Sequence, residues 1–238
     1  MPDRLHHPPM SRFASLGTRC IALALLPLAC QVAVAARGEP PASAHLATPT
    51  SFSPARLTAD ARAVASWVVG EGDAHGLPFL IVDKRQATVF AFDPAGHLLG
   101  GAPALLGLAR GDDSVPGIGE RKIADIQPHE RTTPAGRFAA ELGNNSHGED
   151  ILWVDYEDAV SMHRVRPVKA SERRLQRLAS PTPADNRISY GCINIPPGFF
   201  DGVVKPLFVP RNGIVYVLPD TKPLGAVFRA AVTRTAHR

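Results

Sequence analysis

The chain has 238 residues, of which 26 are Lys or Arg and 22 are Asp or Glu, so its formal net charge is +4. Three Arg and one Asp lie in residues 1–35, and the remaining chain is therefore close to +2. So mild an excess does not fit a nucleic-acid-binding protein, whose basic charge is far more concentrated. The length after residue 35, about 200 residues, is enough for one domain with a sizeable core.

The N-terminal segment predicts a protein that is exported. Residues 1–19 are basic, residues 20–36 are apolar, and Ala33-Val34-Ala35 offers the small residues that signal peptidase requires. We expect a signal peptide over residues 1–35, cleaved near Ala35, and a periplasmic or secreted mature protein. An uncleaved membrane anchor and a lipoprotein signal ending at Cys30 are the alternatives.

A leader and a helix are expected next. Residues 36–53 are rich in Pro, Ala, Ser and Thr, which predicts a flexible leader. Pro54 suits the first turn of a helix with Ser53 as its N-cap, and Gly70 suits its end. Apolar residues at helical spacing lie between these signals: Leu57, Ala61, Val64 and Val68. Residues 54–76 are therefore predicted to be an N-terminal helix and its connection.

Most of the remaining chain predicts short strands. Runs rich in β-branched and aromatic residues, bounded by Gly, Pro and Asp, lie at 77–84, 87–93, 137–142, 150–156, 159–165 and 213–220. Pro196-Pro197 introduces a short helix, and residues 226–238 predict another. Many short strands with few helices favour a mainly β fold, either a sandwich or a curved mixed sheet with a few short helices.

Cys192 is the only cysteine left after the predicted signal peptide is removed. A lone thiol in a compartment that favours disulfides is either buried and inert, an intermolecular partner, or a nucleophile. Gly191 has no Cβ, so a substrate carbonyl could approach the sulfur closely. Backbone amides at 190–192 could form an oxyanion hole, and Ser189 could hold the turn by side-chain to backbone hydrogen bonds.

Three segments resemble the L,D-transpeptidase (YkuD-type) catalytic domains, which are cysteine acyltransferases of the bacterial envelope. Ser189-Tyr190-Gly191-Cys192-Ile193-Asn194 is similar to their S-H-G-C-h-[RN] signature, and "TTPAGRF" at 132–138 matches their T-P-x-G-x-F segment. Ser161-Met162-His163-Arg164 lies at the end of a predicted strand, where the family has its catalytic histidine. The hairpin at 80–96 also resembles the family's opening strands.

The resemblance implies an L,D-transpeptidase-like catalytic domain over residues 77–220, followed by a C-terminal tail at 221–238. It implies that Cys192 is the nucleophile and His163 its general base, acting on peptidoglycan stem peptides through a thioester. Carbapenem-type inhibitors are expected to acylate the same sulfur. The reaction needs no metal and no cofactor, and the sequence carries no signal for an oligomeric state.

Other positions are expected to support the site. Ser189, Tyr190 and Gly191 are assigned to the turn and its oxyanion hole, and Arg187 and Asn194 to substrate binding. Tyr190 replaces the family's usual His, and Asn194 stands where many members have Arg. The connection from His163 to Cys192 is longer than usual, which indicates an inserted loop or short helix at 168–187. Its basic residues form either a cationic rim for substrate carboxylates or an ordinary solvated surface.

Several alternatives remain open. If water resolves the thioester in place of an amine, the protein is an L,D-carboxypeptidase. A chain that keeps the fold without turnover is an envelope-binding protein. His147 lies in "NSHGE" and imitates the signature without its cysteine, so a surface turn is the expected structure there. His147, Glu149, Asp150 and Asp155 lack the spacing of known metal sites, and no metal is expected.

Overall fold

The computed structural model describes residues 57–229. The predicted signal peptide and leader, the Ser53 cap and the last nine residues of the tail lie outside the described residues. Within residues 57–229, no helix has the length and apolar character needed to cross a membrane.

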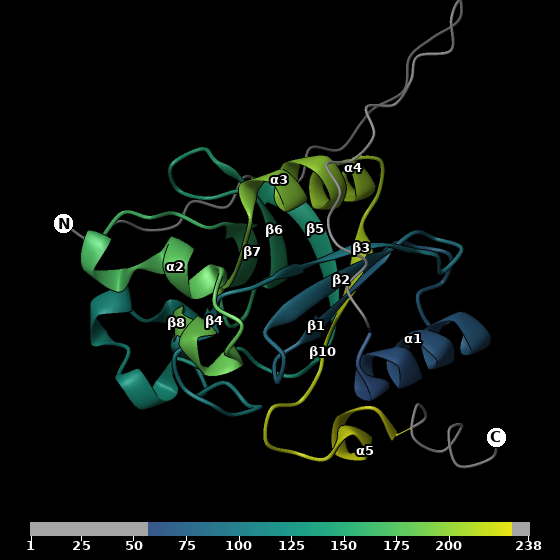
Figure 1. The fold of residues 1–238 in the computed structure, drawn as a ribbon, viewed down its shortest axis with the longest axis horizontal. Coiled ribbons are helices and arrows are strands. Elements are labelled where there is room, and N and C mark those ends of the chain that lie inside the picture. The colour runs from purple at the N-terminus through teal and green to yellow at the C-terminus, as the bar shows by residue number, and fades with distance from the viewer. Residues whose placement is uncertain (1–56, 230–238) are drawn as a thin grey trace, which may run out of the picture. The chain divides into compact units, whose positions relative to one another are not determined.

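Eight strands form one mixed sheet in the order β3-β2-β1-β10-β5-β6-β7-β9, and β4 and β8 form a separate parallel pair (Figure 1). The strands are β1 Phe79–Asp83, β2 Thr88–Phe92, β3 Leu98–Pro103, β4 Leu106–Gly107, β5 Gly136–Asn144, β6 Asp150–Asp155, β7 Val160–Arg164, β8 Arg187–Ser189, β9 Ile193–Ile195 and β10 Gly213–Val217. The prediction of a mainly β fold is confirmed. The two short strands on either side of Cys192, β8 and β9, were not predicted.

The helices are short except for the first. They are α1 Ala59–Glu71, α2 Arg174–Leu178, α3 Pro197–Phe199, α4 Lys205–Phe208 and α5 Leu224–Val227. A π-helical turn, Phe200–Val204, joins α3 to α4, so the helix predicted after Pro196-Pro197 is present. Single 3-10 turns lie at Ile118–Glu120, Ile123–Asp125, Pro128–Glu130, Ala170–Glu172 and Pro183–Asn186.

Helix α1 begins and ends later than the sequence predicted. Its N-cap is Thr58, whose hydroxyl accepts a hydrogen bond from the Ala61 amide at 3.1 Å. Its C-cap is Gly72, which adopts a left-handed conformation with φ of 66° and donates its N–H to the carbonyl of Val68. Gly70 is an ordinary helical residue, because the left-handed position that favours glycine comes two residues later.

The sheet separates two apolar cores. Side chains of β1 alternate between its faces, so Leu80 and Val82 join the larger core while Phe79 and Ile81 pack with α1 on the other side. Figure 1 shows α1 lying beside β1, β2 and β10. All five residues of β1 are buried, which explains why its sequence is a continuous apolar run.

The sheet is curved, and its two halves share the larger core. Leu80 of β1 and Met162 of β7 lie in the same buried cluster, although their strands are several places apart in the sheet. A further bridge joins Leu105, just beyond edge strand β3, to Asn194 of the opposite edge strand, with N···O distances of 2.8 and 2.9 Å. The chain therefore forms the curved mixed sheet of the two predicted arrangements, curled so far that its edges nearly meet.

The pairing of β7 with β9 positions the candidate site. These strands run parallel, and His163 lies opposite Asn194. Cys192 directly precedes β9, so the register places it only two residues from the position on β9 that faces His163, and the thiol and the imidazole come from neighbouring strands. The longer connection between them leaves this edge of the sheet undisturbed, because it forms α2 and the flanking 3-10 turns outside the sheet.

Candidate active site

The turn before Cys192 depends on Gly191. This residue has a φ of 132°, and a Cβ built on it would lie 2.9 Å from the carbonyl oxygen of Thr132. A side chain here would be both strained and obstructed. The hydroxyl of Ser189 donates to the carbonyl of Cys192 at 2.6 Å and accepts from the Gly191 amide at 3.1 Å. An oxyanion site in this turn would therefore have to use the amides of Tyr190 and Cys192.

Thr133 ties this turn to the protein interior. Its hydroxyl donates to the carbonyl of Gly191 at 2.8 Å and accepts from the amide of Gly107 at 2.9 Å. Thr133 is fully buried, so neither backbone group has water as a replacement partner. The sequence placed Thr133 in a family motif, but its contact with the cysteine turn joins residues 58 positions apart and was not predicted.

A buried lysine, Lys84, holds the backbone of Thr133 by a hydrogen bond. Lys84 has no exposed surface, and its Nζ donates to the carbonyls of Gly111 and Thr133 and to Asp112 Oδ1, at 2.6, 2.7 and 2.9 Å. Burial lowers the pKa of Lys84, although the hydrogen bond and charge of Asp112 act in the opposite direction. All three donors of the ammonium group are used, which is how a buried cation is accommodated. Sequence reasoning missed Lys84 altogether, since it lies at the end of an apolar strand.

The sulfur of Cys192 is half-buried and is not in a disulfide. Ser161 Oγ lies 3.6 Å from it and the carbonyl of Ala159 lies 3.8 Å from it. Burial raises the pKa of the Cys192 thiol, but the hydrogen bond and charge of His163, together with the amide and hydroxyl of Ser161, outweigh burial and leave that pKa below its usual value. A thiol with a lowered pKa and partial access is the reactive kind of cysteine.

The His163 ring is held at both nitrogens. Nδ1 lies 2.9 Å from the carbonyl of Arg164, and Nε2 lies 3.2 Å from Nδ2 of Asn194. Burial lowers the pKa of the imidazole, whereas the hydrogen bond and charge of Cys192 and the Arg164 carbonyl raise it, and the net result is a pKa above the usual value. The opposite shifts of the two groups show that each stabilises the charged form of the other.

Arg187 is buried, whereas the predicted role in substrate binding requires an accessible guanidinium. Its Nη2 donates to the carbonyl of Lys84 at 2.8 Å, and it forms an ion pair with Asp220 at 2.9 Å. The carboxylate that this guanidinium meets is thus the protein's own, and it cannot bind a substrate without breaking that pair. The sequence showed that Arg187 is close to the turn. It did not show the partner, because Asp220 follows strand β10 much later in the chain.

Asn194 is also turned inward. Its side chain is 1% exposed and lies between His163 and Arg174, whose Nη1 donates to Asn194 Oδ1 at 2.7 Å. Direct substrate binding is therefore replaced by a contact with the imidazole. Tyr190 is the exposed member of the turn, and the guanidinium carbon of Arg131 lies 4.0 Å from the centre of its ring.

The inserted segment does not form a simple cationic rim. Arg177 donates to the carbonyls of Glu172 and Asp185, and Arg174 pairs with Glu172. Lys169, Arg173 and Arg177 are the basic residues of the segment without an ion pair among the described residues. Arg173 lies with Arg177 and Asp185 at a polar hollow of about 350 Å³ on α2. Ion pairs thus neutralise Arg174 and Arg187, and the positive charge left on the segment is that of Lys169, Arg173 and Arg177.

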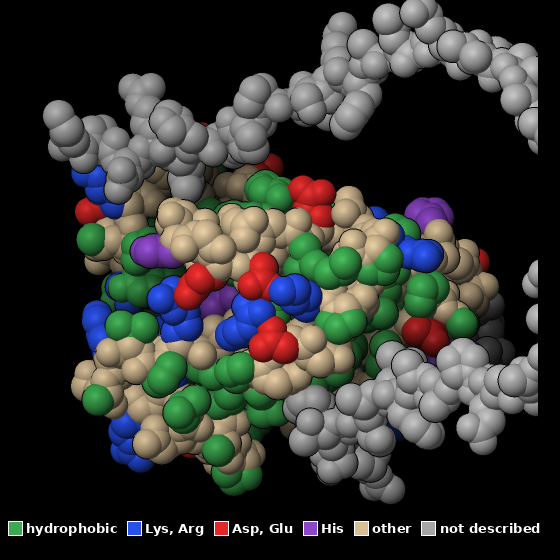
Figure 2. Space-filling view, turned by 90° about the horizontal axis from the view of Figure 1, so that it is seen from above, with side chains coloured by type: hydrophobic (Ala, Val, Ile, Leu, Met, Phe, Trp, Pro, Cys, Tyr) green, Lys and Arg blue, Asp and Glu red, His purple; other side chains and the backbone are tan. Residues whose placement is uncertain are grey.

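A second group of charges links β6, β7 and the π-helical turn. Arg164 forms ion pairs with Asp150 and Asp201, and Lys205 reaches the same Asp150 at 2.9 Å. Hydrogen bonds from Arg164 and Lys205 lower the pKa of Asp150 to about 2. Figure 2 shows basic and acidic side chains side by side on the face that carries α3 and α4. This group stabilises the strand end from which His163 projects.

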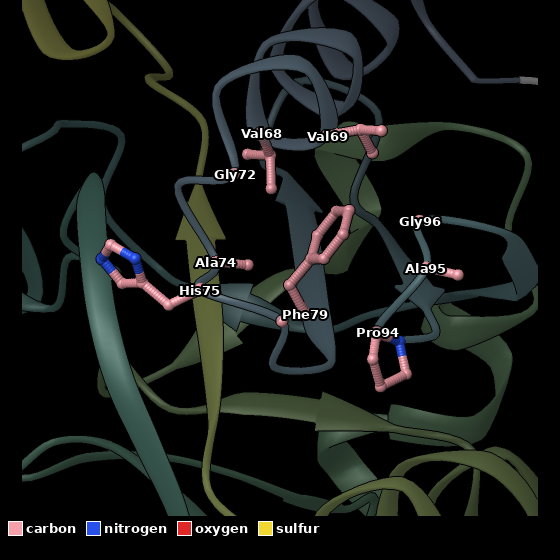
Figure 3. Close-up of a pocket in the computed structure, with 10 residues that line it drawn as sticks. Val68, Val69, Gly72, Ala74, His75, Phe79, Pro94, Ala95 and Gly96 are labelled. Carbon is pink, nitrogen blue, oxygen red and sulfur yellow. The ribbon is translucent and has the colours of Figure 1, made fainter.

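The pocket in Figure 3 is separate from the thiol. It is a cavity of about 80 Å³ between the end of α1 and the turn after β2, lined by Val68, Val69, Phe79 and Pro94 among others. Its size and apolar lining are those of a packing defect, well below the volume of a typical ligand pocket. Within residues 57–229, no group of three or more His, Cys, Asp or Glu side chains could hold a metal ion. His147 lies in an exposed turn, where Asn145 Oδ1 accepts from its amide.

Comparisons with known proteins give structural neighbours only. No protein-family model and no curated protein matches the chain. Similar solved structures include an L,D-transpeptidase from Xylanimonas cellulosilytica, at 13% identity and a TM-score of 0.39, with 59% of this chain and 60% of that one covered. The catalytic domain of the E. faecium L,D-transpeptidase is 19% identical, with a TM-score of 0.32, and covers 59% of this chain and 96% of its own.

A third neighbour is the helical cell shape determining protein Pgp2 from Campylobacter jejuni, in its K307A form, at 12% identity and a TM-score of 0.39, with 75% of this chain and 64% of that one covered. The match thus spans about three fifths of the Xylanimonas chain. Scores this low do not establish an activity. Both the Xylanimonas and the E. faecium structures are described as L,D-transpeptidases.

Proposed function

We propose that the chain is a cysteine acyltransferase of the L,D-transpeptidase type, which transfers the acyl group of a peptidoglycan stem peptide through a thioester on Cys192. One observation carries the proposal: strand β7 and the turn before its parallel neighbour β9 bring together an imidazole and a half-buried thiol, and the pKa of each group shifts in the direction that favours the charged pair. The motif resemblance supplies the substrate class. A peptidoglycan substrate also fits the predicted export, so we place the protein in the periplasm or outside the cell.

The first half of the proposed reaction forms the thioester. His163 Nε2 takes the thiol proton as the sulfur of Cys192 attacks the carbonyl carbon of the peptide bond before the terminal D-alanine. The carbonyl oxygen becomes an oxyanion, for which the amides of Tyr190 and Cys192 are the available donors. As the C–N bond breaks, Nε2 returns its proton to the leaving amine, and the acyl group remains on sulfur.

The second half releases the acyl group. An acceptor amine attacks the thioester and gives a proton to Nε2, the C–S bond breaks, and the thiolate regains that proton. The product is a cross-link between two stem peptides. The thioester retains the energy of the broken amide, so the exchange needs no ATP. With water as acceptor the same steps give a trimmed peptide, which would make the protein an L,D-carboxypeptidase.

Intact-mass analysis with a carbapenem tests the thioester step. We expect the purified protein to gain the mass of one carbapenem, and Cys192→Ala, folded by circular dichroism, to gain none. A His163→Ala variant should acylate about 100-fold or more slowly, the usual loss when a general base is removed. A folded wild-type protein that forms no adduct after prolonged incubation would contradict the enzyme and favour an envelope-binding protein of the same fold.

Stem peptides then separate the two enzymatic outcomes. Incubation of the protein with a purified tetrapeptide stem and an acceptor stem should yield a cross-linked dimer by mass spectrometry. Accumulation of the peptide shortened by one D-alanine, with no dimer at high acceptor concentration, would replace the transpeptidase by the carboxypeptidase. Cys192→Ala should yield neither product.

A further inference from the structure

The inserted segment at 168–187 sends one side chain into the site. Arg174 is the first residue of α2, and its guanidinium donates from Nη1 to Asn194 Oδ1 at 2.7 Å and from Nε to Glu172 Oε2. The side chain of Arg174 is only 15% exposed. Asn194 in turn contacts His163 Nε2 at 3.2 Å. A chain of direct contacts therefore leads from the insert to the imidazole.

The contacts with Arg174 and His163 fix the orientation of the Asn194 side-chain amide. A guanidinium only donates, so the Asn194 atom that faces Arg174 must be the carbonyl oxygen, and the amino group is then turned to His163. A backbone carbonyl only accepts, so the His163 nitrogen that faces the carbonyl of Arg164 must carry the proton of the neutral ring. In this state Nε2 is the acceptor, and the Asn194 amino group donates to its lone pair.

We propose that Arg174 is a positioning residue that acts through Asn194 to weaken the hold of His163 Nε2 on its proton, so that the imidazolium is a stronger acid. When Nε2 takes a proton, its N–H faces the Asn194 amino group, and two donors oppose each other. Rotation of the amide would relieve this contact but would turn the amino group toward Arg174. Either arrangement disfavours the imidazolium. The inference rests on the proposed function because it takes His163 as the general base.

The charge of Arg174 acts in the same sense, whereas the charges of Cys192 and Glu149 oppose it. The positive charge of Arg174 lowers the pKa of His163, against the raising effect of Cys192. Glu172 is paired with Arg174, Glu149 interacts with the imidazole at longer range, and the guanidinium of Arg164 is turned to Asp150 and Asp201. A more acidic imidazolium protonates the leaving amine more readily. This proton transfer is needed in the step that releases D-alanine.

The pH dependence of Cys192 alkylation by iodoacetamide tests the proposal without any acyl donor. The reaction is followed by mass spectrometry on the peptide that contains Cys192, because Cys20 and Cys30 also react in the full chain. We expect Arg174→Gln to move the midpoint of the rate to lower pH by about one unit, that is, about tenfold in the equilibrium for the thiolate–imidazolium pair. Without Arg174 the amide is free to present its oxygen to Nε2–H, and a neighbouring positive charge is lost.

A second variant changes Asn194, the residue between Arg174 and His163. Asn194→Asp has nearly the shape of the amide and still accepts from Arg174, but it offers Nε2 an acceptor in place of a donor. Asn194→Asp should shift the midpoint in the same direction as Arg174→Gln. If Arg174→Gln does not fold, the result for Asn194→Asp alone tests the proposal. Arg174→Lys keeps a charge and a donor, and we expect it to restore most of the wild-type midpoint.

Arg177→Gln is the matched control. It removes the same charge from the same helix, but its guanidinium contacts only the carbonyls of Glu172 and Asp185, so the midpoint should not move. A midpoint that stays or rises in the Arg174 and Asn194 variants would overturn the proposal, as would an acid shift in only one of two folded variants or an equal shift in Arg177→Gln. Absence of a carbapenem adduct would overturn the proposed acyltransferase function. The midpoint of Cys192 alkylation could still be measured and compared between variants.

Discussion

The turn that carries Cys192 and the insert that carries Arg174 reach the same site from very different surroundings. The turn is fixed by buried hydrogen bonds from Ser189 and Thr133, and Thr133 is itself held by Lys84. The insert is mostly exposed, and Leu178 is the single buried residue of α2. The contrast separates two requirements of the chemistry. The sulfur must stay in place, whereas the acidity of the imidazole can be set by a segment added at the surface.

The largest expected effect comes from the turn. Gly191→Ala places a Cβ 2.9 Å from the carbonyl oxygen of Thr132 in a backbone conformation that side chains rarely adopt, so the turn must move. A displacement of about 1 Å at a nucleophile costs about 100-fold in rate. We therefore expect carbapenem acylation, measured by intact mass over time, to slow by at least that factor.

Gly202→Ala is the control for that experiment, since a Cβ there meets nothing within 4 Å. It should acylate at the wild-type rate. If Gly191→Ala also acylated at that rate, the turn would be far more tolerant than its contacts indicate, and the contrast with the insert would disappear.

Thr133→Val tests the buried support of the turn. The change keeps the shape but leaves the Gly107 amide and the Gly191 carbonyl without their hydroxyl partner, at about 1–3 kcal/mol each. We expect the free energy of unfolding in urea to fall by about 2–6 kcal/mol. Thr133→Ser should recover most of it, and Thr88→Val, which loses a hydroxyl contact at the surface, should change it by less than about 0.5 kcal/mol. Equal losses at both positions would argue against a special role for Thr133.

The sequence predicted those parts of the fold that local pattern decides. Apolar and β-branched runs identified β1, β2, β6, β7 and β10, which pack on the core, and β5, of which only Ala140 is buried. Strands β8 and β9 have three residues each, too few for a period to be read. The start of α1 was misplaced because the sequence analysis chose Ser53 as the cap, whereas Thr58 can also fill that position and its hydroxyl accepts the bond from the Ala61 amide.

The site was predicted less completely than the fold. Cys192 and His163 were identified by family resemblance, and the fold brings them together. The roles of Arg187 and Asn194 depend on Asp220 and Arg174, which are distant in sequence. A basic residue close to a catalytic motif looks the same in the sequence whether it binds substrate or an internal carboxylate. Only the fold distinguishes these cases, and it assigns both residues to the interior.

A smaller effect is expected when the insert is loosened. Leu178 packs with Leu105 and Val165, and Leu178→Ala should weaken the docking of α2 by about 2 kcal/mol. Hydrogen exchange should then speed up roughly thirtyfold for the amides of α2 and remain unchanged for Ile193 and Ile195 of β9. Leu175 lies on the same helix and is 52% exposed, so Leu175→Ala should leave both sets unchanged. Faster exchange in β9 as well would mean that turn and insert open together.

The smallest effect is expected at Tyr190, the exposed side chain of the turn. Its ring stacks on Arg131 at 4.0 Å and is 37% exposed, and a cation–π contact at such a site contributes about 0.5–1 kcal/mol. Tyr190→Ala should therefore lower the free energy of unfolding by that amount, while Tyr190→Phe, which keeps the ring, should not change it. Acylation should follow stability and change little, because the buried contacts of Ser189 and Thr133 hold the sulfur without help from this ring. If Tyr190→Ala slowed acylation tenfold at nearly unchanged stability, the ring would contact the acyl donor, and the exposed side of the turn would have a binding role that its packing does not require.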